Sequence, residues 1–169
     1  LMKKKQDFTG GMIEADENNV VVSTDKRGLK YLDKDLYDFE IIDTPKLNNI
    51  LILPFNLIKI LYLSLISFSI LKKRKIKKVF STGGYMSLPV ILAARFLNLD
   101  IYLIEPNQVL GRANKFFLNS CKKIFCYSNE IKNFPEKFKN KIVIINPLVK
   151  EKIYNLKKDN ESKNEFNLL

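Results

Sequence analysis

Short apolar segments alternate along this chain with longer segments of helical pattern, and this alternation limits the possible folds more than any other feature. The apolar segments are rich in Val, Ile and Phe, as buried strands are, and cover residues 4–8, 19–23, 39–43, 78–81, 101–105, 124–127 and 142–145. The helical patterns cover residues 54–71, 88–97 and 111–120, with shorter ones at 26–32 and 148–156. Strands that alternate with helices form βαβ units. The sequence therefore predicts an α/β fold with a parallel sheet and flanking helices.

Both ends of the chain depart from this alternation. Only about seven residues separate Gly11 from the second predicted strand, whereas a crossover between parallel strands needs a dozen or more. Either the first strand is not parallel to the second, or a helix has been lost between them. Residues 157–167 are polar and charged, as linkers are, and an apolar segment begins again at residue 168. We therefore predict one domain over residues 1–156, then a linker and the start of a missing domain over residues 157–169.

The chain is strongly basic, with a formal net charge of +11 and a pI of about 9.6. Such a charge favours an anionic partner: nucleic acid, a membrane surface or a phosphorylated substrate. The abundance of Lys, Ile and Asn also fits an AT-rich genome, which would explain much of the charge without any partner. The composition alone leaves both explanations open.

The residue types that are missing or few exclude several kinds of chemistry. The sequence has no His, which removes the usual general base and the Ser/His/Asp and Cys/His nucleophile arrangements. Four residues separate Cys121 from Cys126, a spacing that matches no metal-ligand pattern. We expect no metal and no cofactor, and we expect both cysteines to be small core residues in a reducing compartment.

The segment STGGYMSLP, residues 81–89, joins a predicted strand to a predicted helix. Its two glycines permit a sharp backbone turn, Ser87 can cap the helix, and Pro89 fits the first helical turn. A helix N-terminus attracts phosphate or carboxylate, and ligands of open α/β sheets lie at the carboxyl ends of the strands. The segment therefore indicates an anion site, with a plain strand-to-helix turn as the alternative.

A second polar loop follows the next predicted strand. Glu105, Asn107 and Gln108 place a carboxylate and two amides on one loop, ahead of Gly111 and Asn114. Carboxylate and amide groups form bidentate hydrogen bonds to sugar hydroxyls because together they donate and accept. Ordinary loop polarity, with Asn107 capping the following helix, is the alternative.

Residues 50–71 form an apolar run that approaches the length needed to span a bilayer, and six basic residues follow within residues 72–78. Asn56, Lys59, Ser64 and Ser67 interrupt the run and fall on one stripe of a helix, which leaves a broad apolar face. The pattern fits an interfacial helix whose basic end attracts anionic headgroups better than it fits a span. A core helix with a solvated basic end is the alternative. The residues expected to contact the membrane are Leu57, Leu61, Lys72, Lys73, Arg74 and Lys75.

Taken in order, these segments resemble the N-terminal domain of the MurG family of N-acetylglucosaminyltransferases. Gly83-Gly84-Tyr85-Met86-Ser87-Leu88-Pro89 matches the family pattern GGYxSxP at every fixed position. The family's HEQN segment is represented by residues 104–107, which keep Glu105 and Asn107, and Gly111 and Asn114-Lys115 follow at the family spacing. Asn146-Pro147 matches a closing NP pair. The resemblance covers about residues 19–156.

The resemblance implies a GT-B glycosyltransferase, in which two Rossmann-like domains flank a cleft. This chain would be the N-terminal, acceptor-binding half of an inverting hexosyltransferase that converts lipid I to lipid II in peptidoglycan synthesis. The donor, UDP-N-acetylglucosamine, would be bound mainly by the missing domain. The expected location is peripheral, at the cytoplasmic face of the plasma membrane, on an anionic surface.

The resemblance also assigns site residues. Gly83, Gly84, Tyr85 and Ser87 would cradle the acceptor diphosphate, and Glu105, Asn107 and Asn114 would contact sugar or acceptor hydroxyls. Glu105 is the matched residue that could serve as the catalytic base.

Three departures from the family pattern bear on catalysis. The family's first glycine loop, GGTGGH, is reduced to Gly10-Gly11 followed by Met12, and Ile104 and Pro106 replace the His and Gln of HEQN. We also expect the donor domain to be missing from this chain. We therefore expect the chain alone to be inactive.

Two other functions are consistent with parts of the sequence. A non-catalytic, membrane-associated subunit of a split two-chain glycosyltransferase would carry the same acceptor domain. A nucleic-acid-binding domain would use the basic charge, but that charge lies mostly in residues 72–78 and the tail, without interleaved aromatic residues. We therefore expect no nucleic-acid partner.

Overall fold

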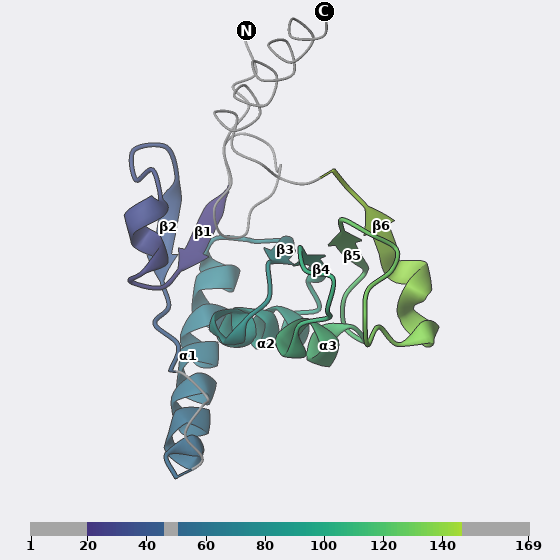
Figure 1. Cartoon of the computed structure of the whole chain (residues 1–169). Helices are drawn as coiled ribbons and strands as arrows, with labels where there is room; N and C mark the ends of the chain where they lie inside the picture. The colour runs from purple at the N-terminus through teal and green to yellow at the C-terminus, as the bar shows by residue number, and fades with distance from the viewer. Residues whose placement is uncertain (1–19, 46–50, 147–169) are drawn as a thin grey trace, which may run out of the picture.

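The computed structural model describes residues 20–45 and 51–146 (Figure 1). The strand predicted at residues 4–8, the helix predicted at 148–156 and the linker predicted at 157–169 lie outside these residues. The predicted domain limits, which extend into the same regions, stay a prediction.

All strands in the described residues pair in parallel, which confirms the predicted fold class. β1 (Val21–Thr24) pairs with β2 (Asp38–Ile41) in one sheet. The second sheet has the order β3-β4-β5-β6. Its strands are β3 (Lys78–Ser81), β4 (Asp100–Glu105), β5 (Lys123–Cys126) and β6 (Ile142–Ile144). Because these four strands are parallel, their carboxyl ends all lie at the same edge of the sheet.

Within residues 20–45 and 51–146, three α-helices and three short 3₁₀ helices connect the strands. The α-helices are α1 (Leu53–Lys73), α2 (Leu88–Phe96) and α3 (Arg112–Phe117). The 3₁₀ helices are η1 (Gly28–Tyr31), η2 (Tyr85–Ser87) and η3 (Glu136–Lys141).

Two of the predicted helices are shorter than expected. The helix predicted at residues 26–32 is only the turn η1, which ends where the backbone becomes extended at Leu32. The helix predicted at 111–120 ends at Phe117, because the chain turns to enter β5 and the Lys122 amide already donates to Ile101 O at 2.8 Å.

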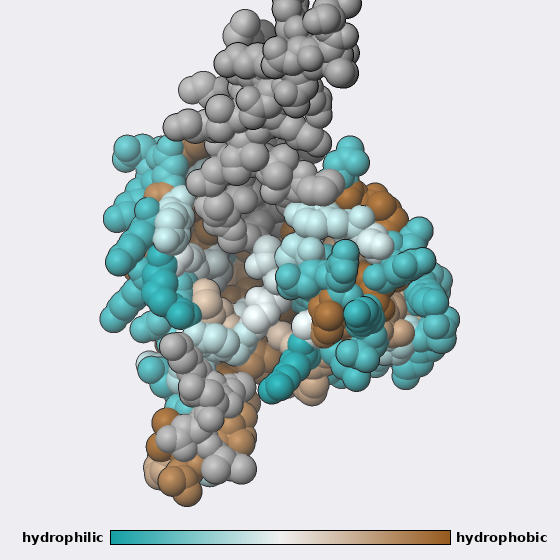
Figure 2. Space-filling model, viewed as in Figure 1, coloured by the Kyte–Doolittle hydropathy of each residue, from teal (hydrophilic) through white to brown (hydrophobic). Residues whose placement is uncertain are grey.

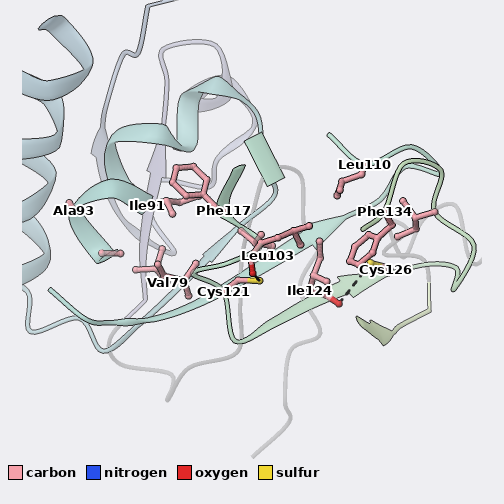
Figure 3. Packing of buried hydrophobic residues seen from close by; sticks show 14 of the residues in the cluster. Val79, Ile91, Ala93, Leu103, Leu110, Phe117, Cys121, Ile124, Cys126 and Phe134 are labelled. Atoms are coloured by element: carbon pink, nitrogen blue, oxygen red, sulfur yellow. Dashed lines mark hydrogen bonds between the residues drawn. The ribbon is translucent and has the colours of Figure 1, made fainter. Parts of the chain in front are cut away.

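The core lies between the β3–β6 sheet and the helices α2 and α3 (Figure 3). Ile91 of α2, Leu103 of β4, Phe117 of α3 and Ile124 of β5 are completely buried there. On the other face of the sheet, Phe80, Tyr102 and Phe125 form a stacked row from strand to strand, since neighbouring residues of a strand point to opposite faces.

Helix α1 packs against α2, and the buried residues of α1 are Ile60, Ser64, Ser67 and Leu71, so only the two serines of the predicted polar stripe lie inward. Ser64 and Ser67 are buried, and each donates its hydroxyl to the carbonyl four residues earlier, Ile60 O and Leu63 O, at 2.8 Å. These bonds satisfy the buried hydroxyls within the helix. The broad apolar face of α1 is consequently turned away from the domain.

Candidate functional site

The β3–α2 loop has the geometry that its two glycines predict. Gly83 and Gly84 both adopt φ of +80°, a conformation that residues with a Cβ rarely adopt. A Cβ on Gly83 would lie 2.7 Å from Asn114 Oδ1, whereas a Cβ on Gly84 would meet no atom within 4 Å. Gly83 therefore permits close contact between two loops, and Gly84 leaves open space beside the backbone.

Ser87 and Pro89 complete this loop, and of these two residues only Pro89 has the structural role that the sequence predicts. Pro89 lies in the first turn of α2, as expected. Ser87 occupies the N-cap position, but its Oγ donates to Gly84 O at 2.9 Å instead of accepting a helix amide. The predicted side-chain cap is therefore wrong, because this hydroxyl closes the turn η2.

Glu105 organises the loop that follows β4. Its side chain is buried, and its two carboxylate oxygens accept four hydrogen bonds. Oε1 accepts from Asn107 N at 3.2 Å and Asn107 Nδ2 at 3.0 Å; Oε2 accepts from Gly111 N at 2.8 Å and Asn114 Nδ2 at 3.0 Å. A carboxylate in this position holds the loop and the start of α3 together. The alternative in which Asn107 caps α3 is wrong, because Gly111 occupies that position.

Asn114 joins the two loops. Its Nδ2 donates to Ile104 O and to Glu105, while its Oδ1 is buried with no hydrogen-bond partner among the described residues. This acceptor lies against Gly83. The structure thus brings together four of the predicted site residues: Gly83, Glu105, Asn107 and Asn114.

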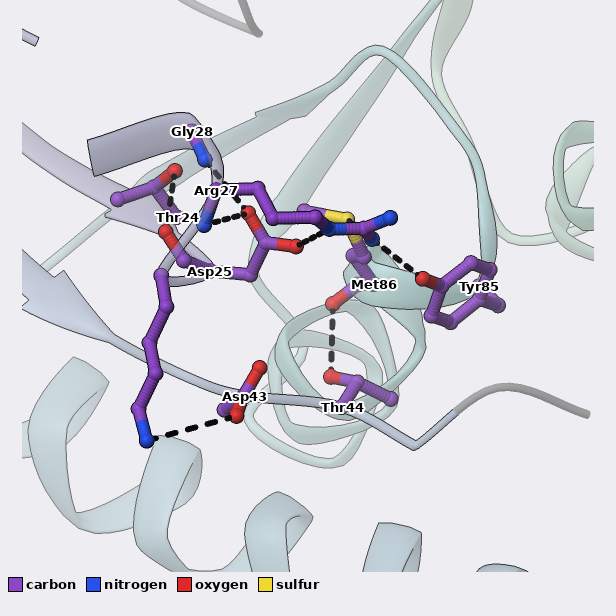
Figure 4. Close-up of polar contacts among 9 residues, drawn as sticks. Thr24, Asp25, Arg27, Gly28, Asp43, Thr44, Tyr85 and Met86 are labelled. Carbon is purple, nitrogen blue, oxygen red and sulfur yellow. Dashed lines mark hydrogen bonds and ion pairs between the residues drawn. The ribbon is translucent and has the colours of Figure 1, made fainter. Parts of the chain in front are cut away.

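A further polar network, which the sequence patterns did not reveal, links the β1–η1 turn to the glycine loop (Figure 4). Buried Asp25 accepts hydrogen bonds from Gly28 N at 2.7 Å, Arg27 N at 3.1 Å and Arg27 Nε at 2.8 Å. Burial pushes the pKa of Asp25 upward, but the hydrogen bonds from Gly28 and Arg27 outweigh it and hold this pKa below its usual 3.8. Arg27 Nη2 donates in turn to the hydroxyl of Tyr85.

A second contact fastens the same loop from the β2 side. Thr44, which is buried after β2, donates its hydroxyl to Met86 O at 3.2 Å. The residues of η2 are therefore held from both β1 and β2. The sequence signal that could have indicated this network is TDKRG, residues 24–28, in which an acidic residue stands two positions before an arginine in a loop after a strand.

The predicted membrane-contact residues lie on the surface. Leu57 and Leu61 are 48% and 62% exposed, and Figure 2 shows hydrophobic side chains gathered over the projecting end of α1. Lys72, Lys73 and Lys75 are exposed at the other end of the helix. Arg74 differs from them, because it pairs with Asp38 at 2.7 Å and with Glu40 at 3.2 Å. By length and composition α1 could cross a membrane.

Both cysteines are free, buried thiols, as predicted for small core residues. Burial is the main cause that raises the pKa of Cys126 to about 11, with smaller effects from Glu105 and Cys121. Burial also raises the pKa of Cys121. Neither thiol has the lowered pKa of a reactive cysteine.

The parallel sheets with flanking helices, the glycine loop at the carboxyl end of β3 and the amide-rich loop at the carboxyl end of β4 define an α/β domain of the Rossmann-like class. The model of the glycosyltransferase family 28 N-terminal domain matches residues 12–126. The chain belongs to this family, of which it carries the N-terminal domain.

Curated relatives and one solved structure agree with this assignment. The chain is 50% identical, over 91% of its length, to the UDP-N-acetylglucosamine–N-acetylmuramyl-(pentapeptide) pyrophosphoryl-undecaprenol N-acetylglucosamine transferase of Pelagibacter ubique. The enzyme of the same name from Rickettsia felis is 34% identical over 85% of the chain. The chain spans 44% and 39% of these two relatives.

The crystal structure of Acinetobacter baumannii MurG has the same fold. It matches with a TM-score of 0.60 at 24% identity, over 76% of this chain and 37% of the solved one. At this level of identity the match establishes the fold. It agrees with the predicted α/β, GT-B-type N-terminal domain.

Proposed function

We propose that this chain is the acceptor-binding half of an inverting hexosyltransferase that transfers N-acetylglucosamine from UDP-N-acetylglucosamine to lipid I, giving lipid II for peptidoglycan. The observation that carries the proposal is the 50% identity, over 91% of the chain, to the Pelagibacter enzyme of that name. The acceptor hydroxyl attacks the anomeric carbon, the bond from that carbon to UDP breaks, and a base takes the hydroxyl proton. Most of the donor contacts come from a domain outside this chain.

The acceptor diphosphate is assigned to the β3–α2 loop, through Gly83, Gly84, Tyr85 and Ser87. Two observations support this assignment. The open space beside Gly84 lets a ligand approach the backbone, and the loop leads into the N-terminus of α2, where the helix dipole favours negative charge.

Sugar or acceptor hydroxyls are assigned to Asn107 and Asn114 on the β4–α3 loop. The unpartnered Oδ1 of Asn114 supports this, because a buried acceptor gains free energy from a hydroxyl that donates to it. Glu105 as the catalytic base stays a prediction. Its four hydrogen bonds favour a positioning role, since accepting a proton would weaken the bonds that hold the loop.

Membrane contact is assigned to α1, with the chain peripheral at the cytoplasmic face of the plasma membrane. Leu57 and Leu61 belong to an exposed apolar face that would lie among the acyl chains, and Lys72, Lys73 and Lys75 would meet anionic headgroups. Arg74 contributes less, because Asp38 and Glu40 already neutralise it.

An exchange of domains tests the proposed function. The chain would replace the matching N-terminal part of the Pelagibacter relative, and transfer of labelled N-acetylglucosamine to lipid I in mixed micelles would be measured. We expect transfer by the chimera and none by the chain alone. A folded chimera that binds UDP-N-acetylglucosamine but transfers nothing to lipid I would contradict the proposal.

The alternative, a non-catalytic subunit of a split transferase, predicts a different result. In that case transfer would appear when the chain is mixed with a separate donor-binding chain from the same source. The exposed apolar face of α1 suits an anchoring subunit equally well, so the readout that separates the two functions is the need for a second chain.

A further inference from the structure

Arg27 presents an exposed cation beside the glycine loop, and its guanidinium is fixed at two points. Nε donates to Asp25 Oδ2 at 2.8 Å, and Nη2 donates to the Tyr85 hydroxyl and lies 3.5 Å from Met86 Sδ. The side chain is nevertheless 62% exposed. Figure 4 shows the guanidinium reaching from the β1–η1 turn to the start of η2, across 58 positions in the sequence.

The buried carboxylate of Asp25 accepts the backbone amides of Arg27 and Gly28 on Oδ1 and the Arg27 Nε on Oδ2. A long, exposed side chain normally loses conformational entropy when it is held in place, yet here a buried anion and a phenol hold it. Within the described residues, Nη1 has no hydrogen-bond partner.

These features match what arginine provides at phosphate sites: a planar, permanently charged fork whose orientation is set before the ligand arrives. Burial of Asp25 and its contact with Nε set the plane of the fork. The bond to Tyr85 places the fork at the loop assigned to the diphosphate. The open backbone at Gly84 and the arginine would then offer the anion both backbone dipoles and a full charge.

We infer that Arg27 is a further binding residue of the acceptor site, where its free Nη1 contacts the diphosphate while Nη2 holds Tyr85 in place. The inference rests on the proposed function, because it takes the glycine loop as the diphosphate site. It adds a residue from the β1–η1 turn, a part of the chain to which the family motifs assign no role.

The test uses the intact 169-residue chain and geranyl diphosphate as a water-soluble probe, with geraniol as the uncharged reference. Binding is measured by titration calorimetry for the unmodified chain, Arg27→Gln and Arg27→Lys. The matched control is Lys30→Gln, which removes one positive charge from an exposed side chain of the same turn η1.

We expect Arg27→Gln to weaken geranyl diphosphate binding about tenfold or more, as expected for the loss of a charge-assisted hydrogen bond. Arg27→Lys should recover part of the affinity, Lys30→Gln should leave it unchanged, and geraniol binding should not respond to any variant. Thermal unfolding of Arg27→Gln should begin at a lower temperature than that of the unmodified chain, because Oδ2 of the buried Asp25 loses its side-chain donor. Binding is therefore compared at a temperature at which all variants are folded.

Tyr85→Phe separates direct contact from positioning. This variant removes the acceptor of the Nη2 bond but keeps the cation, so we expect a smaller loss of affinity than for Arg27→Gln. Equal losses would overturn the direct contact.

Two other results would also count against the inference. Unchanged binding by Arg27→Gln would overturn it alone, whereas no binding by the unmodified chain would overturn the proposed acceptor role with it.

Discussion

Helices α1 and α2 lie side by side and are both strongly apolar, but only α1 keeps a large apolar face exposed and buries serines beside its apolar residues. α2 buries Ile91, Ala93 and Ala94, as a core helix does. α1 buries Ser64 and Ser67 together with Ile60 and Leu71, and it leaves several large apolar side chains exposed: Phe55, Leu57, Ile58, Leu61, Tyr62 and Leu65.

The difference shows that hydropathy alone does not tell which face of a helix meets the core. At the α1–α2 contact small side chains allow the two backbones to approach, and the hydroxyls are satisfied within α1. An exposed apolar face of this size is typical of a surface that meets a membrane or another partner. The predictions below test whether the two helices differ in this way.

The largest expected effect is on stability, from truncation of an apolar residue in each helix. Ile91→Ala should lower the free energy of unfolding by about 2–5 kcal/mol, because it leaves a cavity in the core. Leu61→Ala should change it by less than about 0.5 kcal/mol, since this side chain is mostly exposed. Urea denaturation measures both. Equal losses would mean that another part of the protein covers α1.

The second prediction places a large side chain on the buried face of α1 and a small one on its exposed face. Ser67→Leu should destabilise the domain by about 1–3 kcal/mol, because a large side chain cannot fit at the contact with α2. Leu65→Ser, on the exposed face, should change stability little and improve solubility. Melting temperatures by circular dichroism provide the comparison, and a stable Ser67→Leu variant would show that the contact is loose.

The third prediction uses pH to test the hydrogen bonds of Asp25, which hold Arg27 beside Tyr85 of η2. The pKa of Asp25 is lower in the folded state, so its contribution to stability is present at neutral pH. This contribution is lost as the pH falls below 3.8 and through the folded-state value. Asp25→Asn should therefore cost about 1.5 kcal/mol at pH 7 and almost nothing in strong acid.

Urea denaturation at a series of pH values measures the difference between Asp25→Asn and the unmodified chain. Leu61→Ala serves as the control from α1, because its small effect should not vary with pH. A cost for Asp25→Asn that persists in strong acid would show that the effect arises from packing, not from the charge.

The smallest effect per residue is expected at the basic end of α1. Lys72→Gln and Lys73→Gln should each weaken binding to vesicles with anionic lipid by about 1 kcal/mol, and the effect should shrink as salt is added. Lys132→Gln, an exposed lysine in the β5–β6 connection, is the control. Co-sedimentation with vesicles of known anionic content gives the affinities. Equal losses for all three would indicate only a general effect of charge.

The sequence predicted the strands better than the helices. The segments predicted at 78–81 and 101–105 match β3 and β4 almost residue for residue. Buried parallel strands form short, nearly continuous apolar runs, so the limits of such a run mark the limits of the strand. The helix predicted at 26–32 is only η1, because the backbone becomes extended at Leu32. Sequence periodicity does not show where the backbone leaves the helical conformation.

The site was predicted in part for the same reason. Motifs pointed to Gly83, Glu105 and Asn114 separately, but the contact between Gly83 and Asn114 depends on how β3 and β4 align. The link from Arg27 to Tyr85 spans two loops that no local pattern connects. For α1, the 3.6-residue period revealed the polar stripe, but the period does not show that Ser64 and Ser67 of this stripe are buried while Lys59 is exposed.

The four hydrogen bonds to Glu105 have a consequence for the thermodynamics of binding. They hold the loop from Glu105 to Asn114 in one shape through contacts within the protein itself. A ligand that binds this loop therefore has little protein conformational entropy to remove, and its binding enthalpy should follow the hydrogen bonds that the ligand itself makes. In a series of acceptor analogues, removing one hydroxyl at a time should shift the measured heat in discrete steps, with the shape of the loop unchanged throughout.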